Sequence, residues 1–445
     1  MDLNSSLSSN TINVVSTLTK PTEDAKSSPT SSSSSSSSEL HKPISYWPGV
    51  YHSPVTDALW NERASINERL FDIPDDAPPP TELLTRTPSE SRTTIVYAFS
   101  SDSTLREQYK DPWNEFRIGK LLEDLDVLAC AVSFKHCSDD DITTRPLMLV
   151  TASVDRIVLK KPISVDKDLK ISGSIIWVGR SSIEIQMQVI TQGNGPDDSD
   201  SVALTAKFIF VARDYKTSKA AQVNRLTPET EQEKFLFDGA EARDKARMKR
   251  GEDKKQSDKS EVNRLEASLS EGRIFCDMPA LADRDSILLR DTRLENALIC
   301  HPQQRNLHGR IFGGFLMHRA YELAFSTAYA FAGIVPSFLE VDHVDFYKPV
   351  DVGDFLRFKS CVLYTEHDNP DQPLIYVEVV AHVTRPEMRS SVVSNTFYFT
   401  FTVRPEAKAT KNGFRLRNVV PATEEEARRV LERMDAEDLQ RSQSI

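Results

Sequence analysis

The feature that most constrains this chain is an internal repeat. Residues 154–165 read VDRIVLKKPISV and residues 341–352 read VDHVDFYKPVDV, so five residues recur at a constant offset of 187. Three β-rich runs follow each copy, at 169–178, 182–189 and 203–211 in the first half and at 356–364, 374–383 and 392–403 in the second. This self-similarity predicts one structural unit present twice, each copy ending in antiparallel strands.

A long apolar helix is predicted before the strands of each half. In the second half it spans 315–332, is apolar nearly all round, and is stopped by Gly333 and Pro336. In the first half 120–134 has the same character, and 94–99 is the strand that enters it. A helix of this kind must be surrounded by other structure. The sequence therefore predicts an α+β fold in which a curved antiparallel sheet wraps a central helix, twice in tandem.

Polar segments set the expected domain boundaries. We expect a disordered serine-rich arm at 1–60, a first domain with a leading helix at 61–214, a charged and partly helical linker at 215–285, a second domain at 286–405, and a tail with a short helix at 406–445.

Two capping patterns predict where helices begin in the linker and in the tail. Thr227 before Pro228 predicts a charged helix that runs toward Arg250. Thr423 with Glu426 three residues later predicts a short helix through about residue 434.

Composition narrows the class of partner. A net charge of −11 and a pI near 5.5 argue against nucleic acid, and no stretch approaches the ~20 apolar residues of a membrane span. The five cysteines are odd in number and show no CxxC spacing or secretory signal, so we expect reduced intracellular thiols. The nine histidines show no spacing of metal ligands, so we expect no metal.

The serine-rich N-terminal arm does not identify the cellular compartment of the protein. Its serine richness resembles that of an organelle transit peptide, but the first 42 residues contain no arginine and several acidic residues. The last four residues, SQSI, are not a peroxisomal signal.

At this point the sequence resembles a known family, the double-hotdog acyl-CoA thioesterases, and in particular their mitochondrial-type branch with a long linker. The resemblance covers residues 91–214 and 286–404. Its motifs are HPQQRN at 301–306, RIFGGFLM at 310–317, AYELA at 320–324, and RIGKLLEDLD at 117–126. It implies a tandem hotdog fold, hydrolysis of acyl-CoA, homo-oligomers, and no cofactor, because coenzyme A is part of the substrate. It favours a mitochondrial location, with plastid and cytosol left open.

The resemblance also implies a carboxylate seven residues after the second glycine of the motif. In the second half that position is Tyr321, whereas the same count from Gly119 in the first half gives Asp126. Asp126 would lie on an apolar helix face, where burial raises the pKa of a carboxyl group toward the range of a general base. The alternative is a buried carboxylate that caps or hydrogen-bonds a neighbouring strand.

The rest of the expected site lies in the second half. By resemblance, Asn306 orients the water or the carbonyl, while Gly313 and Gly314 let the thioester approach the free N–H groups of a helix N-terminus. Asn306 alternatively closes an Asx turn, and the glycines alternatively permit tight packing. The mirror site, formed by Asp111, Gly119 and Tyr321, lacks this complement.

Basic residues around these positions are candidates for the phosphates of coenzyme A. They are Arg305, Arg310, Lys160, Lys161 and Lys348. His308 is interpreted as a solvated loop residue rather than a catalyst.

These observations predict hydrolysis of fatty acyl-CoA to a fatty acid and free coenzyme A. Asp126 would act as general base or as a nucleophile through an anhydride, and the sequence does not separate the two. The main alternative is a non-catalytic acyl-CoA sensor. A hydratase-type lyase would need its own Asp and His motif, which the sequence lacks, and a purely structural tandem module is the weakest alternative. The sequence does not indicate the preferred acyl chain length.

Overall fold

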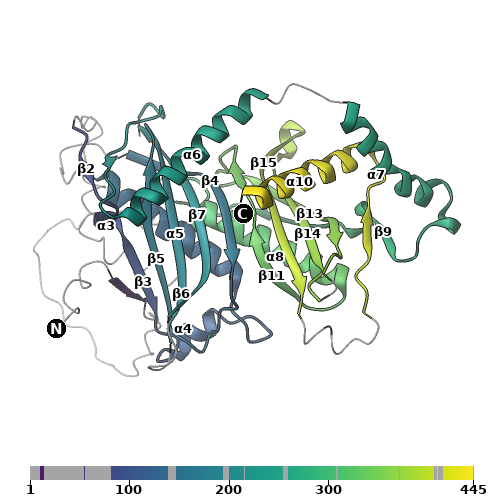
Figure 1. Cartoon of the computed structure of the whole chain (residues 1–445), viewed down its shortest axis with the longest axis horizontal. Helices are drawn as coiled ribbons and strands as arrows, with labels where there is room; N and C mark the ends of the chain where they lie inside the picture. Colours follow the sequence, from purple (N-terminus) through teal and green to yellow (C-terminus); the bar gives the residue numbers. More distant parts are fainter. Residues whose placement is uncertain are drawn as a thin grey trace, which may run out of the picture.

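The computed structural model describes residues 11–14, 55, 82–138, 147–193, 200–214, 216–253, 259–306, 309–369, 371–404, 408 and 414–443. Two halves, each made of a long helix and a sheet, lie side by side (Figure 1). All five cysteines are free thiols. Within the described ranges, no helix is both long enough and apolar enough to cross a membrane.

The first half is built around helix α5 (Ile118–Cys137). Its leucines Leu121, Leu125 and Leu128 are fully buried. An antiparallel sheet packs on α5 in the order β3-β5-β6-β7-β4. The strands are β3 (Thr93–Tyr97), β4 (Leu147–Leu159), β5 (Leu169–Val178), β6 (Ser182–Thr191) and β7 (Ser201–Asp214).

The second half repeats this arrangement around α8 (Gly313–Ala332), which ends at Gly333 with φ +66°. Glycine adopts this left-handed conformation without strain. The sheet order here is β11-β15-β14-β13-β10, with β12 paired to β15. The strands are β10 (Leu294–Ile299), β11 (Pro336–Val341), β12 (Val344–Phe346), β13 (Phe355–Glu366), β14 (Leu374–Arg385) and β15 (Ser390–Val403).

Short elements complete the described chain. They are β2 (Thr85–Arg86), α3 (Pro88–Ser91), α4 (Ser103–Gln108), β8 (Arg225–Leu226), η2 (Pro279–Leu281), β9 (Ser286–Leu288), η3 (Leu289–Thr292), η4 (Pro302–Gln304), η5 (Pro386–Met388) and β16 (Asn418–Val420).

The two halves join through both sheet and helices. Strand β4 pairs with β7 on one side and with β11 and β12 on the other, so one 12-stranded sheet runs through the described chain. The register places Val158 opposite Glu340 and Val154 opposite Val344. The repeated sequence therefore lies at the junction. Helices α5 and α8 pack against each other across it. The predicted α+β architecture, with one wrapped helix in each half, is confirmed.

The N-terminal arm differs from expectation where it is described. Residues Thr11–Val14 form strand β1, which pairs in parallel with β3, and the side chain of Val55 is fully buried. The prediction that the whole arm is disordered is therefore wrong for these residues, because the TINV segment, which alternates polar and apolar residues, adds to an open sheet edge. Most of the arm, and the start of the predicted leading helix, lie outside the described residues.

The linker contains two helices, α6 (Glu231–Asp253) and α7 (Lys259–Asp277). Helix α6 begins later than the Thr227 pattern predicts, because Thr230 supplies the cap. The Glu233 N–H donates to Thr230 Oγ1 at 3.2 Å, and Glu233 Oε2 accepts from the Thr230 N–H at 3.1 Å. Helix α6 then packs on the face of β5 opposite α5, where Trp177 and Ala240 are buried together.

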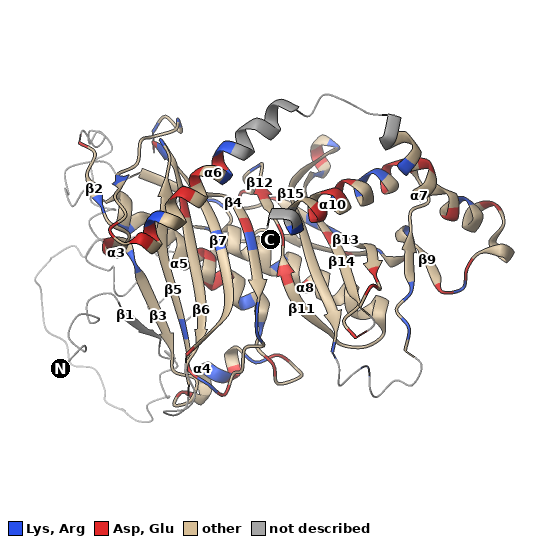
Figure 2. Cartoon of the chain, in the orientation of Figure 1, with Lys and Arg blue, Asp and Glu red and all other residues tan. Residues whose placement is uncertain are grey.

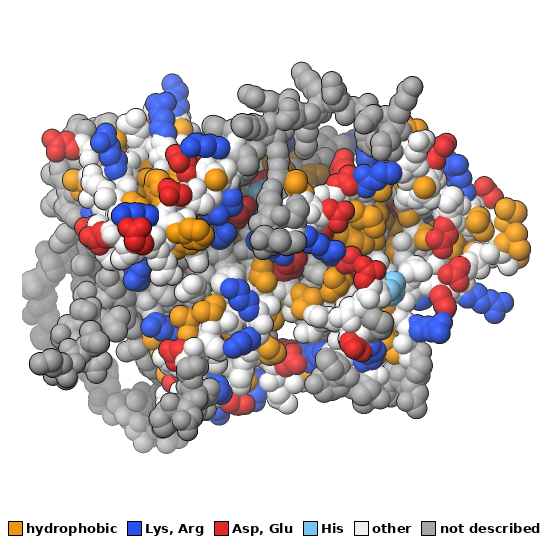
Figure 3. Space-filling view, viewed as in Figure 1, with side chains coloured by type: hydrophobic (Ala, Val, Ile, Leu, Met, Phe, Trp, Pro, Cys, Tyr) orange, Lys and Arg blue, Asp and Glu red, His pale blue; other side chains and the backbone are white. Residues whose placement is uncertain are grey.

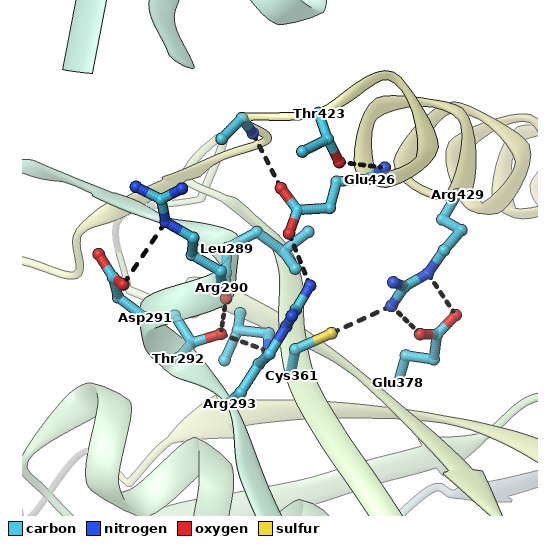
Figure 4. Close-up of polar contacts among 12 residues, drawn as sticks. Leu289, Arg290, Asp291, Thr292, Arg293, Cys361, Glu378, Thr423, Glu426 and Arg429 are labelled. Carbon is cyan, nitrogen blue, oxygen red and sulfur yellow. Dashed lines mark hydrogen bonds and ion pairs between the residues drawn. The ribbon is translucent and has the colours of Figure 1, made fainter. Parts of the chain in front are cut away.

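The C-terminal helix α10 (Glu424–Gln443) extends well past residue 434 and corrects the prediction of a short terminal helix. Its start is capped as predicted, since the Glu426 N–H donates to Thr423 Oγ1 at 3.2 Å. Figure 4 shows how the first turns of the helix are fixed to the second half: Arg429 forms an ion pair with Glu378 of β14, and Arg293 forms one with Glu426 at 2.7 Å. Past residue 434, Arg441 forms an ion pair with Glu366 of β13 at 2.7 Å, which keeps the helix along the sheet.

Helices α6 and α10, which cover the outer faces of the two sheets, are held by the same kind of ion pair. On β6 the fully buried Glu184 pairs with Arg243 of α6, and on β14 the buried Glu378 pairs with Arg429 of α10. The described parts of both helices carry charges of both signs (Figure 2), and the space-filling view in Figure 3 shows acidic and basic side chains interspersed on this face. A buried carboxylate is costly without a cation, so each outer sheet face depends on a helix from outside its own half.

We predict that Arg243→Met lowers the free energy of unfolding by about 3–5 kcal/mol, because it removes the guanidinium group that faces the buried Glu184 carboxylate. Adding Glu184→Met to that variant should restore most of the loss. Lys245→Met is the matched control, since its ion pair with Glu241 is exposed and contributes about 0–1 kcal/mol. Urea unfolding measures all three, and an Arg243→Met protein as stable as wild type would contradict the account.

Candidate active site

Helix packing brings Asp126 of the first half to the N-terminus of α8 in the second. The Gly314 N–H donates a hydrogen bond to Asp126 Oδ2 at 2.7 Å. The other oxygen, Oδ1, accepts from the Thr151 hydroxyl of β4 at 2.9 Å. The Asp126 side chain is fully buried. The structure therefore joins three of the four predicted catalytic residues, because Gly313 is adjacent: a Cβ placed on it would lie 3.1 Å from Asp126 Oδ2.

Burial raises the pKa of the Asp126 carboxyl to about 7, and the hydrogen bonds from Thr151 and Gly314 offset part of that increase. A carboxyl group with this pKa is partly ionised at neutral pH, which suits a general base. Its ionisation also opposes folding. The contribution of the protonated carboxyl to stability is lost as pH rises from the unfolded value near ~4 to about 7.

The glycine pair is required by close approach of the two helices. A Cβ on Gly314 would lie 2.9 Å from the Cα of Glu123, closer than such atoms come. Gly314 therefore packs tightly, and its N–H is the donor to Asp126. The Gly313 N–H belongs to the first turn of α8, whose N–H groups have no acceptor within the helix and lie at the positive end of its dipole. Such donors can stabilise a developing oxyanion.

Asn306 lies in the loop that leads to α8, and residues 307 and 308 are outside the described chain, so His308 is not placed. The Asn306 side-chain oxygen accepts from the Arg310 N–H at 3.2 Å, and its own N–H donates to the Arg310 carbonyl at 2.6 Å. Gly309 closes the turn with φ +78°. The turn interpretation of Asn306 thus describes its local contacts, while its part in catalysis stays a prediction.

The mirror site is filled by side chains. A Cβ on Gly119 would lie 3.1 Å from the Tyr321 ring, and that ring packs on Phe338 with centroids 5.5 Å apart. Asp111 Oδ1 accepts from the N–H groups of Trp113 and Glu115, at 2.8 and 2.7 Å. An aromatic ring therefore stands where Asp126 stands in the other site.

Thr151 is the site residue that sequence reasoning missed. Its counterpart at the repeat offset of 187 is Phe338. The hydrogen-bonded pair Asp126 and Thr151 thus corresponds to the packed aromatic pair Tyr321 and Phe338. Two polar residues in one half that align with two aromatic residues in the other are a signal that the sequence contained.

A second buried carboxylate on α5 faces elsewhere. Asp124 accepts hydrogen bonds from Tyr97 Oη at 2.9 Å and Tyr109 Oη at 2.5 Å, and burial raises its pKa to about 6. Both tyrosines are fully buried in the first half, so Asp124 points away from α8. Among the described residues, no three His, Cys, Asp or Glu side chains are arranged to hold a metal ion.

The five candidate cations divide into two groups. The first group lies near the start of α8. Arg310 is three residues before Gly313 and forms an ion pair with Asp351 at 3.8 Å, and Arg305 forms a β-bridge with Ile311 in the same loop. Lys348 comes two residues after Phe346, whose ring is near Gly313. Lys160 and Lys161 follow the far end of β4, nine and ten residues from Thr151. At ~3.3 Å per residue this is roughly 30 Å along the strand. They are therefore far along β4 from the Thr151 hydroxyl that contacts Asp126.

Comparison with known proteins decides the family. The chain is 72% identical over 440 residues to acyl-coenzyme A thioesterase 2, chloroplastic, of Humulus lupulus, covering 98% of this chain and 99% of that protein. It is 63% identical to acyl-coenzyme A thioesterase 4, mitochondrial, of the same plant, covering 90% and 76%. It is 33% identical to the human acyl-coenzyme A thioesterase 9, mitochondrial, covering 78% and 77%. No family model matches the chain.

The chain belongs to the acyl-coenzyme A thioesterases. It is a double-hotdog acyl-CoA hydrolase, and the expectation drawn from the sequence motifs is confirmed at that level. Hydrolysis is thus favoured over the sensor alternative. In this thioesterase the hydrogen bond from Gly314 to Asp126 joins a titratable carboxyl group to the N-terminus of α8.

We predict that Gly314→Ala lowers kcat about 10²-fold, because the added methyl group forces α8 away from α5 and a displacement of about 1 Å can have that effect. Gly239→Ala on α6 is the matched control, since the nearest atom would lie at an ordinary 3.6 Å. Steady-state release of free coenzyme A measures both. A Gly314→Ala enzyme with wild-type kcat would show that the close approach is not needed.

Proposed function

We propose that this thioesterase hydrolyses acyl-CoA at the contact between α5 and α8, with Asp126 as the reacting carboxylate. The observation that carries the proposal is the 2.7 Å hydrogen bond from the Gly314 N–H to Asp126 Oδ2. It places a carboxyl group with a pKa of about 7 beside the free donors of a helix N-terminus. Asp126 comes from the first half and the donors from the second, so each half alone is incomplete.

In the general-base route, Asp126 takes a proton from a water molecule as the water oxygen attacks the thioester carbonyl carbon. The carbonyl oxygen becomes an oxyanion that accepts from the Gly313 N–H. When the carbon–sulfur bond breaks, the coenzyme A thiolate leaves and takes up the proton held by Asp126. Neither step requires a metal or a further cofactor.

In the nucleophilic route, an oxygen of Asp126 attacks the same carbon and expels the thiolate, which gives a mixed anhydride that water then hydrolyses. Thr151 positions the carboxylate in both routes, because its hydroxyl holds Oδ1 and leaves Oδ2 to face the glycine pair. A single turnover in ¹⁸O-labelled water detects the anhydride: water attack on its Asp126 carbonyl labels the Asp126 peptide, which the general-base route never labels.

The loop before α8 completes the proposed site. Asn306 orients the water or the carbonyl, and Arg305, Arg310 and Lys348 meet the phosphates of coenzyme A. The position of Lys160 and Lys161, roughly 30 Å away along β4, favours assigning them to the mirror side rather than to the thioester.

The organelle and the assembly are also proposals. Two plant relatives are named chloroplastic and mitochondrial, and we place this enzyme in one of those organelles as a homo-oligomer. Import of the full chain into isolated chloroplasts and mitochondria, and the molar mass in solution from light scattering, test these two statements.

We predict that Asp126→Asn lowers the rate of coenzyme A release by about 10²–10⁴-fold, the range of a lost general base. Asn306→Ala should lower it by about 10²-fold, as for a lost orienting donor. Asp124→Asn is the matched control on the same helix and should keep the wild-type kcat. A thiol assay over a chain-length series of acyl-CoAs measures all three, and wild-type turnover in both site variants would contradict the assignment.

We predict that kcat rises with pH through about 7, because the reaction needs ionised Asp126. Thr151→Val removes a hydrogen bond that lowers the pKa of Asp126, so it should move this acidic limb to higher pH. Thr327→Val, on α8 and bonded to Ser360, is the control and should leave the limb in place. Profiles of kcat against pH decide the point, and identical limbs in Thr151→Val and wild type would exclude Thr151 as a positioning residue.

A further inference from the structure

The contact between α5 and α8 has a local two-fold relation. Gly119 and Gly314 are equivalent residues of the two helices. A Cβ on Gly314 would meet the Cα of Glu123 at 2.9 Å, and a Cβ on Gly119 would meet Cδ2 of His318 at 2.5 Å. Glu123 follows Gly119 by four residues, as His318 follows Gly314. Glu123 and His318 are thus equivalent residues that meet across the two-fold.

The two residues form a buried ion pair. His318 Nδ1 lies 2.9 Å from Glu123 Oε1, and His318 Nε2 lies 2.8 Å from Glu322 Oε1. The Glu123 side chain is fully buried and His318 is 6% exposed. Among the described residues, the Glu123 carboxylate forms an ion pair with His318 alone. A carboxylate buried to this extent depends on that partner.

We propose that Glu123 and His318 are positioning residues that set the approach of α8 to α5 and so hold the Gly314 N–H on Asp126. Glu123 precedes Asp126 by one turn of α5, and His318 follows Gly314 by one turn of α8. A shift between the helices would therefore change the ion pair and the site together. The inference rests on the proposed role of Asp126.

The ion pair also explains why a first half packs on a second half rather than on another first half. An acid on α5 meets a base on α8 only when a first half packs on a second half. Two first halves would bring Glu123 against a second Glu123, which charge repulsion disfavours. The order that satisfies the ion pair is the order that brings Asp126 to Gly314.

The pair depends on protonation of His318. Burial alone lowers the pKa of His318, but Glu123 and Glu322 more than offset this, and the net shift is upward. The charged groups around the pair are Glu123, Lys120 and Arg117 from α5 and its start, and Glu322 and Arg319 from α8. When pH exceeds the raised pKa, His318 loses its charge and Glu123 is left buried without a cation.

The test is a double-mutant cycle in the full chain with Glu123→Gln, His318→Gln and the two combined. We expect His318→Gln to lower kcat about tenfold or more, since misplacement acts on the chemical step. The combined variant should recover much of that loss, because two neutral amides can hydrogen-bond to each other, so the effects are non-additive in both kcat and Tm. At high pH, loss of the His318 charge should lower kcat, which gives the kcat–pH profile a basic limb. Glu123→Gln should move that limb to lower pH, because it removes a carboxylate that raises the pKa of His318.

His367→Gln, an exposed histidine after β13, is the control and should change nothing. Additive effects in the cycle, or an unmoved basic limb in Glu123→Gln, would overturn the inference. If His318→Gln does not fold, the combined variant and Glu123→Gln still decide it. The Tm values of the cycle measure the coupling between Glu123 and His318 independently of catalysis. Full activity in Asp126→Asn would instead overturn the proposed active site. Failure of this inference can therefore be distinguished from failure of the proposed function.

Discussion

The hydrogen bond between the Gly314 N–H and Asp126 is the interaction on which the rest of this structure depends. It joins a residue of the first half to a residue of the second at 2.7 Å, and the Asp126 side chain is fully buried there. The bond requires a glycine at position 314, because any side chain there would collide with the backbone of Glu123. It also requires both halves to keep their helices in register, which the continuous sheet through β4, β11 and β12 provides.

Duplication followed by divergence accounts for the asymmetry. Each half has a wrapped helix, a buried glutamate on the middle of its sheet and a covering helix whose arginine neutralises that glutamate. The halves differ at the helix contact. There Asp126 and Thr151 in one half correspond to Tyr321 and Phe338 in the other. Polar groups in one copy and aromatic rings in the other leave one position per chain where a buried carboxylate meets a helix N-terminus, with the equivalent position packed as core.

The sequence predicted what is periodic and local. The repeat, the two apolar helices, the glycine stop at Gly333 and the capping residue Thr423 all depend on neighbouring residues, and the structure shows each of them. Asp126 was predictable because its spacing from Gly119 matches a family motif. Thr151 was not singled out, because its role depends on a contact between α5 and a strand 25 residues away.

Long-range packing explains the remaining differences. The length of α10 follows from its ion pairs with the sheet, such as Arg441 with Glu366, which no window of the α10 sequence contains. Strand β1 forms because the edge of β3 is open, which is likewise a property of the assembled sheet. The five basic candidates separated into two groups for the same reason: the position of Lys160 relative to the site is set by strand register and not by residue type.

The central claim is that one chain supplies both parts of one active site. Complementation tests it most directly: Asp126→Asn chains and Gly314→Ala chains are prepared separately, mixed, unfolded and refolded together, and assayed for coenzyme A release. Each chain then carries one defect in its own site. The account predicts activity no greater than the sum of the two variants refolded alone. Activity well above that sum would show that Asp126 and Gly314 meet between chains, and would contradict the account.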